Sequence, residues 1–315
     1  MPLPQLLQGR LRLPVVAAPM FLTSGPDLVI GCCRAGIVGS FPALNQRTTE
    51  GFEEWLTQIE AALTADDAPF AVNLIVHSSN TRVEDDLAAI VRHKVPIVIT
   101  SLGAASTVVD AVHSYGGVVF HDTTNTRFAR KAIEAGVDGL ILVTAGAGGH
   151  AGTINPFALV AEIRAIWDGT ILLSGCVSTG GDVLAAQAMG ADLAYMGTRF
   201  LATQESLVVE EYKQMVLDSG AGDIVYTPSI STLPASFLRA SIVRAGLDPD
   251  DLPPPGKVDL GHVTNPHDAA HRTAKAWRDV WSAGQGVAAV DEVLPVAELV
   301  DRLEVEYAAA KARIA

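Results

Sequence analysis

Short apolar runs alternate with amphipathic segments along the first two thirds of the chain. Within each run the apolar residues are consecutive, whereas a strand with one wet face would show an alternating pattern. Consecutive apolar residues are typical of parallel strands that are covered on both faces. The predicted strands are residues 15–18, 37–40, 70–76, 97–100, 118–121, 139–143, 171–174 and 193–196.

The segments between these runs predict helices. Asn155 and Pro156 illustrate the signal, because an amide side chain can cap a helix and a proline fits its first turn. The predicted helices are residues 26–35, 50–64, 81–93, 105–115, 126–135, 156–167 and 181–189. Eight strands that alternate with helices predict an α/β fold, a TIM (β/α)8 barrel, over residues 1–207.

The pattern changes after residue 203. Segments 208–218, 266–281 and 296–312 are typical of helices, whereas 226–239 shows no regular period. We therefore expect residues 208–315 to form a smaller, mostly helical C-terminal addition. Part of that addition is expected to pack back on the barrel.

Composition narrows the class of protein. With 49% hydrophobic and 18% charged residues, the 315-residue chain is globular. A formal net charge of −13 disfavours a nucleic-acid partner. Cys32, Cys33 and Cys176 cannot make a disulfide framework, so we expect a reducing, cytoplasmic location. Every apolar run is shorter than the ~18 residues that would span a bilayer, so we expect no membrane partner.

The sixth predicted strand leads into a loop with four glycines around His150, between residues 146 and 152. In a parallel barrel the ligand binds at the carboxyl ends of the strands, where this loop lies. Glycine lets the backbone approach a ligand closely, and histidine changes charge near neutral pH. His150 is thus either a base or hydrogen-bond donor over a ligand, or a loop histidine bonded to a nearby carbonyl.

The next two strands also end in glycine turns. The seventh leads through Ser174, Gly175 and Gly180, and the eighth leads to Gly197 and Thr198. Backbone N–H groups in such turns, together with the start of a helix, suit a phosphate monoester. The alternative is that these glycines only turn the chain. Two consecutive turns of this kind favour the phosphate.

Further polar residues lie near the same mouth. Asn73 stands within an apolar strand, where an unpaired amide is costly, so it bonds either backbone or a ligand. His77 and His121 are candidate substrate or cofactor contacts, although a polar loop histidine is ordinary. His267 and His271 share one helix face but lack a third ligand, so we expect no metal site.

Residues 146–151 match the dinucleotide pattern Gly-x-Gly-x-x-Gly/Ala. In a Rossmann unit the helix begins inside that motif, whereas the best helix start here is Asn155, after the glycines. The motif also follows the sixth strand rather than the first. We therefore reject a Rossmann interpretation.

Several motifs together resemble the nitronate monooxygenase family, formerly called 2-nitropropane dioxygenases. They are Ala17-Ala-Pro-Met20, Phe70-Ala-Val-Asn-Leu74, Ala147-Gly-Gly-His-Ala-Gly152, Ser174-Gly175 with Gly180, and Gly190-Ala-Asp-Leu-Ala-Tyr-Met-Gly-Thr-Arg-Phe-Leu-Ala-Thr203. The resemblance covers most of the chain. The Gly-Gly-His-x-Gly loop with the later Met-Gly-Thr-Arg-Phe is specific to this flavin superfamily, and less specific to one reaction.

The resemblance implies noncovalent FMN and oxidation of alkyl nitronates, and of neutral nitroalkanes, by O2 to a carbonyl compound and nitrite. It implies His150 as the catalytic residue, and a homodimer is in line with it. The implied FMN contacts are Pro19, Met20, Asn73, Gly149, Ser174, Gly175, Gly180, Gly197 and Thr198.

The chain departs from the family pattern at three places. Gly146 replaces a usual glutamate, Cys176 replaces the second glycine of Gly-Gly-Ile, and strand five ends in His121-Asp122 rather than the lysine or serine of some relatives. These changes bear on the substrate more than on flavin binding.

Two alternative functions stay open. One is an NAD(P)H-dependent flavin reductase of a quinone or an enoyl thioester on the same scaffold. The other is a barrel that binds a phosphorylated metabolite without flavin.

Overall fold

The computed structural model describes residues 3–103, 106–256 and 276–315. Within these residues the predicted barrel is confirmed, as an eight-stranded sheet with parallel pairing in the order β1-β9-β8-β6-β5-β4-β3-β2. The strands are β1 (Val15–Ala17), β2 (Ser40–Pro42), β3 (Ala71–Ile75), β4 (Ile97–Ser101), β5 (Val118–Thr123), β6 (Gly139–Val143), β8 (Thr170–Ser174) and β9 (Leu193–Met196).

The barrel closes between its first two strands. Val16 and Val38 form a parallel bridge, and the Ala17 N–H donates to the Val38 carbonyl at 2.8 Å. The second strand itself begins two residues after that bridge, at Ser40, so the predicted range 37–40 starts too early. Residues 37–39 turn the chain from the first helix into the barrel.

The barrel interior is filled by side chains from alternate positions of the strands. Leu7, in the short 3-10 helix Gln5–Leu7, belongs to the same cluster. This cluster comprises Leu7, Val16, Val38, Ala71, Ile97, Ile99, Phe120, Ile141, Leu172, Leu193 and Tyr195. A filled interior leaves ligand binding to the mouth of the barrel.

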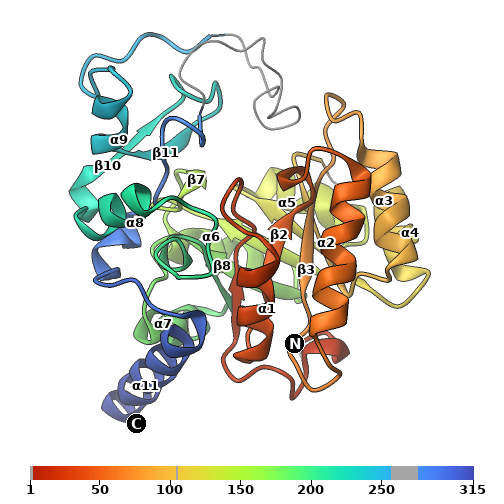
Figure 1. Cartoon of the computed structure of the whole chain (residues 1–315). Helices are drawn as coiled ribbons and strands as arrows, with labels where there is room; N and C mark the ends of the chain where they lie inside the picture. The colour runs from red at the N-terminus through yellow and green to blue at the C-terminus, as the bar shows by residue number, and fades with distance from the viewer. Residues whose placement is uncertain (1–2, 104–105, 257–275) are drawn as a thin grey trace.

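Helices cover the outside of the barrel and bury one apolar face each against it (Figure 1). They lie at the predicted places and mostly end a few residues earlier. They are α1 (Pro26–Arg34), α2 (Thr49–Ala62), α3 (Val83–Arg92), α4 (Ser106–His113), α5 (Thr126–Glu134), α6 (Pro156–Arg164) and α7 (Gly180–Met189).

The described residues after 207 form mainly two groups (Figure 1). One group forms a small lobe beside the barrel mouth, with α8 (Glu210–Leu217), β10 (Ile224–Thr227), β11 (Ala235–Leu238) and α9 (Arg239–Arg244). The last helix, α11 (Val296–Ile314), packs instead against α7 and α1 on the outside of the barrel.

The small lobe contains a sheet that the sequence did not predict. In the described residues this sheet has the order β10-β11-β7, and β7 (Gly149–His150) belongs to the glycine loop of the barrel. The expectation of no regular structure over 226–239 is therefore wrong. Of the predicted helix 266–281, residues 266–275 lie outside the described residues, while Ala276 and Val280 form an isolated bridge.

Among the helices of residues 3–103, 106–256 and 276–315, none is both long enough and apolar enough to cross a lipid bilayer.

Candidate active site

A cavity of about 700 Å³ lies at the carboxyl ends of the barrel strands. Residues after 207 contribute part of its lining, namely Tyr212, Trp277, Ser282, Ala283, Gly284 and Gly286, and the barrel contributes the rest. Trp277 and Ser282 belong with the small lobe, because they contact His150, Phe237 and Tyr212. The sequence-predicted residues that line it are Pro19, Met20, Asn73, His121, Gly149, His150, Ser174, Gly175, Gly197 and Thr198. The fold thus brings most of the predicted site into one space.

His150 lies in β7, where its backbone pairs with Ala235 of β11. Its ring packs edge-on to the Trp277 ring, with centroids 5.3 Å apart and an interplanar angle of 72°. Trp277 in turn stacks on Phe237 at 5.1 Å. The imidazole therefore borders the cavity from the side of the small lobe, held by strand pairing and by aromatic contact.

Hydrogen bonds from the small lobe fix the same loop. The Gly149 N–H donates to the Ser282 hydroxyl at 2.8 Å, and that hydroxyl donates to the Ser236 carbonyl at 2.6 Å. The Ser282 N–H donates to the Tyr212 hydroxyl at 3.0 Å, and the Tyr226 hydroxyl donates to the Ala151 carbonyl at 2.9 Å. These bonds restrict the position of the imidazole before any ligand binds.

Glycine has different roles in the turns after β8 and β9. A Cβ at Gly175 would lie 2.3 Å from the Thr144 hydroxyl, and its φ of +124° suits glycine alone. A Cβ at Gly197 would lie 3.7 Å from Ala18 and Met20, which is ordinary contact distance. Gly175 is thus required by the fold, whereas the absent side chain at Gly197 leaves room at the cavity wall.

Cys176 has a φ of +57°, which lies in the left-handed region that favours glycine. The side chain lines the cavity and lies 4.0 Å from both the Ala145 carbonyl and the Gln285 side-chain oxygen. Burial raises the pKa of the Cys176 thiol above its usual value, with a smaller contribution from Asp182. The thiol is therefore a neutral part of the cavity wall.

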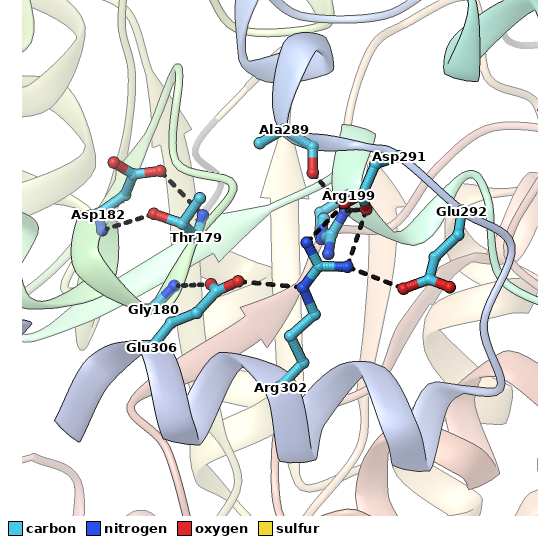
Figure 2. A network of polar contacts seen from close by, with 9 residues as sticks. All are labelled: Thr179, Gly180, Asp182, Arg199, Ala289, Asp291, Glu292, Arg302 and Glu306. Atoms are coloured by element: carbon cyan, nitrogen blue, oxygen red, sulfur yellow. Dashed lines mark hydrogen bonds and ion pairs between the residues drawn. The ribbon is translucent and has the colours of Figure 1, made fainter. Parts of the chain in front are cut away.

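Two sequence-predicted residues lie outside the cavity lining. His77 bonds locally, with its Nδ1 2.8 Å from the Ser79 hydroxyl. Gly180 begins α7, and its N–H donates to the Glu306 carboxylate at 2.8 Å (Figure 2). A Cβ at Gly180 would lie 2.0 Å from the Leu303 carbonyl oxygen, so glycine here permits close packing of α7 on α11.

A polar network connects this helix start to the last helix (Figure 2). Arg302 of α11 donates to Glu306 at 3.1 Å and to Asp291 at 2.7 Å. Asp291 also lies 3.7 Å from Arg199, a buried residue of the 3-10 helix Thr198–Phe200 that follows β9. The start of α7 is capped independently by Thr179 and Asp182, each side chain accepting from the other's backbone N–H. The turns below the cavity are thus braced from the C-terminal helix.

The floor of the cavity carries polar residues from three adjacent strands. Asn73 of β3 donates to the Ser101 hydroxyl at 2.8 Å and to the Ile99 carbonyl at 3.0 Å. The Ser101 hydroxyl donates a short hydrogen bond to Asp122 of β5. Burial raises the pKa of Asp122, while His121 and the bond from Ser101 act in the opposite direction.

His121 precedes Asp122 on β5, but its ring lies next to Thr100 rather than Ser101. Its Nδ1 lies 2.8 Å from the Thr100 hydroxyl, and burial lowers the pKa of the ring below its usual value. A buried histidine with a lowered pKa is neutral at neutral pH.

Sequence reasoning missed Ser101, Tyr212, Trp277 and Ser282, which line the cavity together with Asp122, the residue that follows His121 at the end of strand five. Asp122 carried a signal comparable to that of Asn73, since it is a polar residue at the end of an apolar run. The residues of the small lobe carried none, because they reach the cavity only through tertiary contacts.

His267 and His271 lie outside the described residues. In the part of the chain that the structure describes, no group of three or more His, Cys, Asp or Glu side chains is arranged to hold a metal ion.

Comparison with known proteins shows which family the chain resembles. A model of the family described as nitronate monooxygenase matches residues 77–306. A nitronate monooxygenase of Paraburkholderia phytofirmans is 28% identical, with 93% of this chain and 92% of that protein covered. The solved structure of a nitroalkane oxidase from Streptomyces ansochromogenes has a TM-score of 0.81 and 26% identity, and the match covers 99% of this chain and 100% of that one.

Another relative carries a different name. A 5-hydroxy-7a-methyl-1-oxo-octahydro-1H-indene-4-carboxyl-CoA dehydrogenase of Rhodococcus jostii is 29% identical over 232 residues. That match covers 74% of this chain and 64% of the Rhodococcus protein, so the chain spans less than two thirds of that relative's length.

Proposed function

The chain belongs to the nitronate monooxygenase family of flavin-dependent oxidoreductases, and from that membership we propose that it uses FMN and O2 to oxidise alkyl nitronates. Neutral nitroalkanes are included, and the products are a carbonyl compound and nitrite. The observation that carries the proposal is that His150 and the glycine turns after β8 and β9 line one cavity. The names of the Paraburkholderia and Streptomyces relatives support the substrate class.

The residues present fit FMN. A Cβ at Gly197 would meet Ala18 and Met20 only at contact distance, 3.7 Å, so packing does not require glycine at this point of the cavity wall. Ser174, Gly175, Gly197 and Thr198 would hold the phosphate, because turns and helix starts offer N–H groups to an anion. The ring would be held by Pro19, Met20, Asn73 and Gly149. Gly180 would support this site only through the start of α7, because Glu306 already accepts from its N–H.

His150 would act on the substrate from the side of the small lobe. When bound, FMN would accept electrons from the substrate, while the protein supplies placement and proton handling. The imidazole would hydrogen-bond the nitro oxygens of a nitronate, or take the α-proton of a neutral nitroalkane. A proton transfer by a well-placed group is worth about 10²–10⁴-fold in rate.

A second candidate is redox chemistry of an acyl thioester, with NAD(P)H as the partner that reduces the flavin and an enoyl thioester or a quinone as acceptor. The observation that favours it is the Rhodococcus relative, whose name is that of a CoA-thioester dehydrogenase. The exposed Lys131, at the edge of the same cavity, offers a cation to an anionic substrate tail.

One experiment separates the two candidates. The purified protein is loaded with FMN, and its visible absorbance is followed under anaerobic conditions after mixing with propionate 3-nitronate, with NADH, or with an acyl-CoA. Bleaching by the nitronate but not by NADH is the expected result. Bleaching by NADH or by the thioester alone would favour the second candidate, and a protein that fails to bind FMN would contradict both.

A further inference from the structure

Asp122 lies at the floor of the cavity, on the inner side of the barrel. Two residues before it on β5, Phe120 belongs to the cluster that fills the barrel. Because side chains alternate along a strand, Asp122 points to the same side one layer higher. The same argument places Ser101 above Ile99 on β4 and Asn73 above Ala71 on β3. All three of these polar residues line the cavity.

The hydrogen bonds on this floor have a fixed direction. Asn73 donates its amide N–H to the Ser101 oxygen at 2.8 Å, so the serine hydroxyl directs its own proton to Asp122 Oδ2. The carboxyl group is therefore an acceptor at one oxygen, while the residue as a whole borders the cavity. His150 lies on a different element, β7, which pairs with the small lobe. The floor carboxyl and the imidazole thus come from separate parts of the fold.

His121 and the hydrogen bond from Ser101 stabilise a negative charge on Asp122 only weakly. The charged partner that acts on it is the adjacent His121 ring, and burial lowers the pKa of that ring, which makes it a weak source of positive charge. Burial dominates over both stabilising contacts and raises the pKa of Asp122. A carboxyl in such surroundings gains or loses a proton in response to a new charge close by.

We propose that Asp122 is the residue that couples the charge of the bound flavin to proton uptake from solvent. The inference rests on the proposed flavin cofactor. Reduction of the ring adds two electrons and one proton at the ring, which leaves a negative charge. Where Asp122 is ionised before reduction, its carboxylate takes up one further proton from water and removes the repulsion. A charge close to the ring is one of the means by which a protein tunes a flavin.

The coupling has a measurable size. Each proton taken up with the electrons changes the reduction equilibrium tenfold per pH unit, and a tenfold change corresponds to ~30 mV for a two-electron couple. The midpoint potential of the wild-type flavin should therefore fall more steeply with pH, by one proton's slope, once Asp122 is ionised in the oxidised protein. Asp122→Asn keeps the shape of the side chain but cannot take up this proton, so it should lack the steeper segment.

Other titratable groups border the same cavity and must be separated from Asp122. They are His121, His150, Lys131, Cys176, Tyr195 and Tyr212. Burial raises the pKa of Cys176 and of both tyrosines, and lowers the pKa of His121. Because these groups remain in Asp122→Asn, a difference from wild type reports the carboxyl itself.

The test is the midpoint potential of the FMN-loaded protein, measured by spectroelectrochemical titration from about pH 5 to about pH 9. Three variants accompany the wild type. Asp122→Asn should lose the steeper segment. Ser101→Ala removes a hydrogen bond that favours the ionised carboxyl, so it should shift that segment to higher pH. Asp110→Asn, on the exposed side of α4, changes net charge by the same amount and should leave the profile unchanged.

The outcomes are distinct. If Asp122→Asn and Ser101→Ala both keep the wild-type profile, the inference is wrong while the proposed flavin enzyme stands. If wild type does not bind FMN, the proposed function and the inference fail together. If Asp122→Asn does not fold, Ser101→Ala decides alone, since an unshifted profile overturns the inference and a shift to higher pH supports it.

Discussion

The backbone N–H of Gly180 donates a 2.8 Å hydrogen bond to the Glu306 carboxylate, which ties the first turn of α7 to the last helix of the chain. The positive end of a helix favours a negative group, and here a carboxylate of the protein supplies it. Arg302 holds that carboxylate through a 3.1 Å bond and is held itself by Asp291 (Figure 2). The C-terminal helix is therefore part of the support of the turn after β8.

Gly180→Ala should reduce stability more than it reduces FMN affinity. Its Cβ would lie 2.0 Å from the Leu303 carbonyl oxygen and 2.3 Å from the Tyr307 nitrogen, so α11 would have to move. Overpacking of this kind costs about 1–3 kcal/mol. Urea unfolding followed by circular dichroism measures the loss. A fully stable variant that has lost FMN would instead show direct contact between Gly180 and the cofactor.

Gly197→Ala should have the opposite effect to Gly180→Ala and reduce FMN affinity more than stability. The backbone at Gly197 has φ of −102°, which alanine can adopt, and the added Cβ would be 3.7 Å from Ala18 and Met20. The free energy of unfolding of the flavin-free protein should stay within about 0.5 kcal/mol of wild type. FMN affinity should fall at least about tenfold, a loss of about 1.4 kcal/mol, because the methyl group takes ligand space. Fluorescence titration with FMN checks this, and unaltered affinity would exclude Gly197 from the cofactor site.

Glu306→Ala should destabilise the flavin-free protein by about 1–2 kcal/mol, because it removes a charged acceptor from Gly180 and a partner from Arg302. The lower part of that range is expected because Glu306 is partly exposed to water. Glu306→Gln should lose less, since its amide oxygen can still accept from Gly180. Glu298→Gln, on an exposed position of the same helix, serves as the control. Equal losses of stability for Glu306→Gln and Glu298→Gln would show that the contacts of Glu306 do not stabilise the fold.

His150→Ala should keep FMN and lose most turnover of a neutral nitroalkane, by about 10²–10⁴-fold. FMN should stay bound because β7 pairs with β11 through backbone groups, which alanine preserves. Turnover of a preformed nitronate should suffer less, since no α-proton must be removed. His77→Ala, at a histidine outside the cavity lining, should behave as wild type in steady-state kinetics. Wild-type turnover of the neutral nitroalkane by His150→Ala would remove the imidazole from the mechanism.

The flavin-free protein should lose stability through Asp122 as the pH rises. Burial raises the pKa of this group in the folded state, so the folded chain binds more protons there than the unfolded chain. Its contribution is fully present below about pH 4 and is lost as pH rises through the folded-state pKa. Asp122→Asn should therefore gain stability relative to wild type as the pH rises above about 4. Urea unfolding at several pH values measures this, and a constant difference would contradict it.

The barrel was predictable because its signal is local. Runs such as residues 139–143 are apolar at every position, and glycines such as Gly190, with φ of +111°, mark where helices end. The second strand was placed early because Ile37 and Val38 are also buried, although only Val38 bridges to β1. Burial and strand pairing therefore need not coincide at a barrel seam.

The site was predictable only in part, for a related reason. Strand ends and glycine turns identify the barrel side of the cavity, including Asn73 and Gly197. The sequence has no local pattern for β10 and β11, whose pairing depends on each other and on Gly149–His150. Trp277 and Ser282 likewise reach the cavity through contacts distant in sequence. Asp122 was visible as a polar residue in an apolar run, but its role required knowledge of Ser101 and Asn73 beside it.

Because β7 pairs with β11, the small lobe positions the imidazole, whereas the barrel strands position other residues of the cavity. A change in length of the connection between β10 and β11 would move Gly149 and His150 together, while residues on the barrel strands, such as Asn73 and Ser174, would keep their place. Reaction preference can therefore change in such proteins through the small lobe, while the barrel strands stay unchanged. The same division lets engineers alter selectivity through the small lobe, where Gly149 is the proposed FMN contact that would move as well.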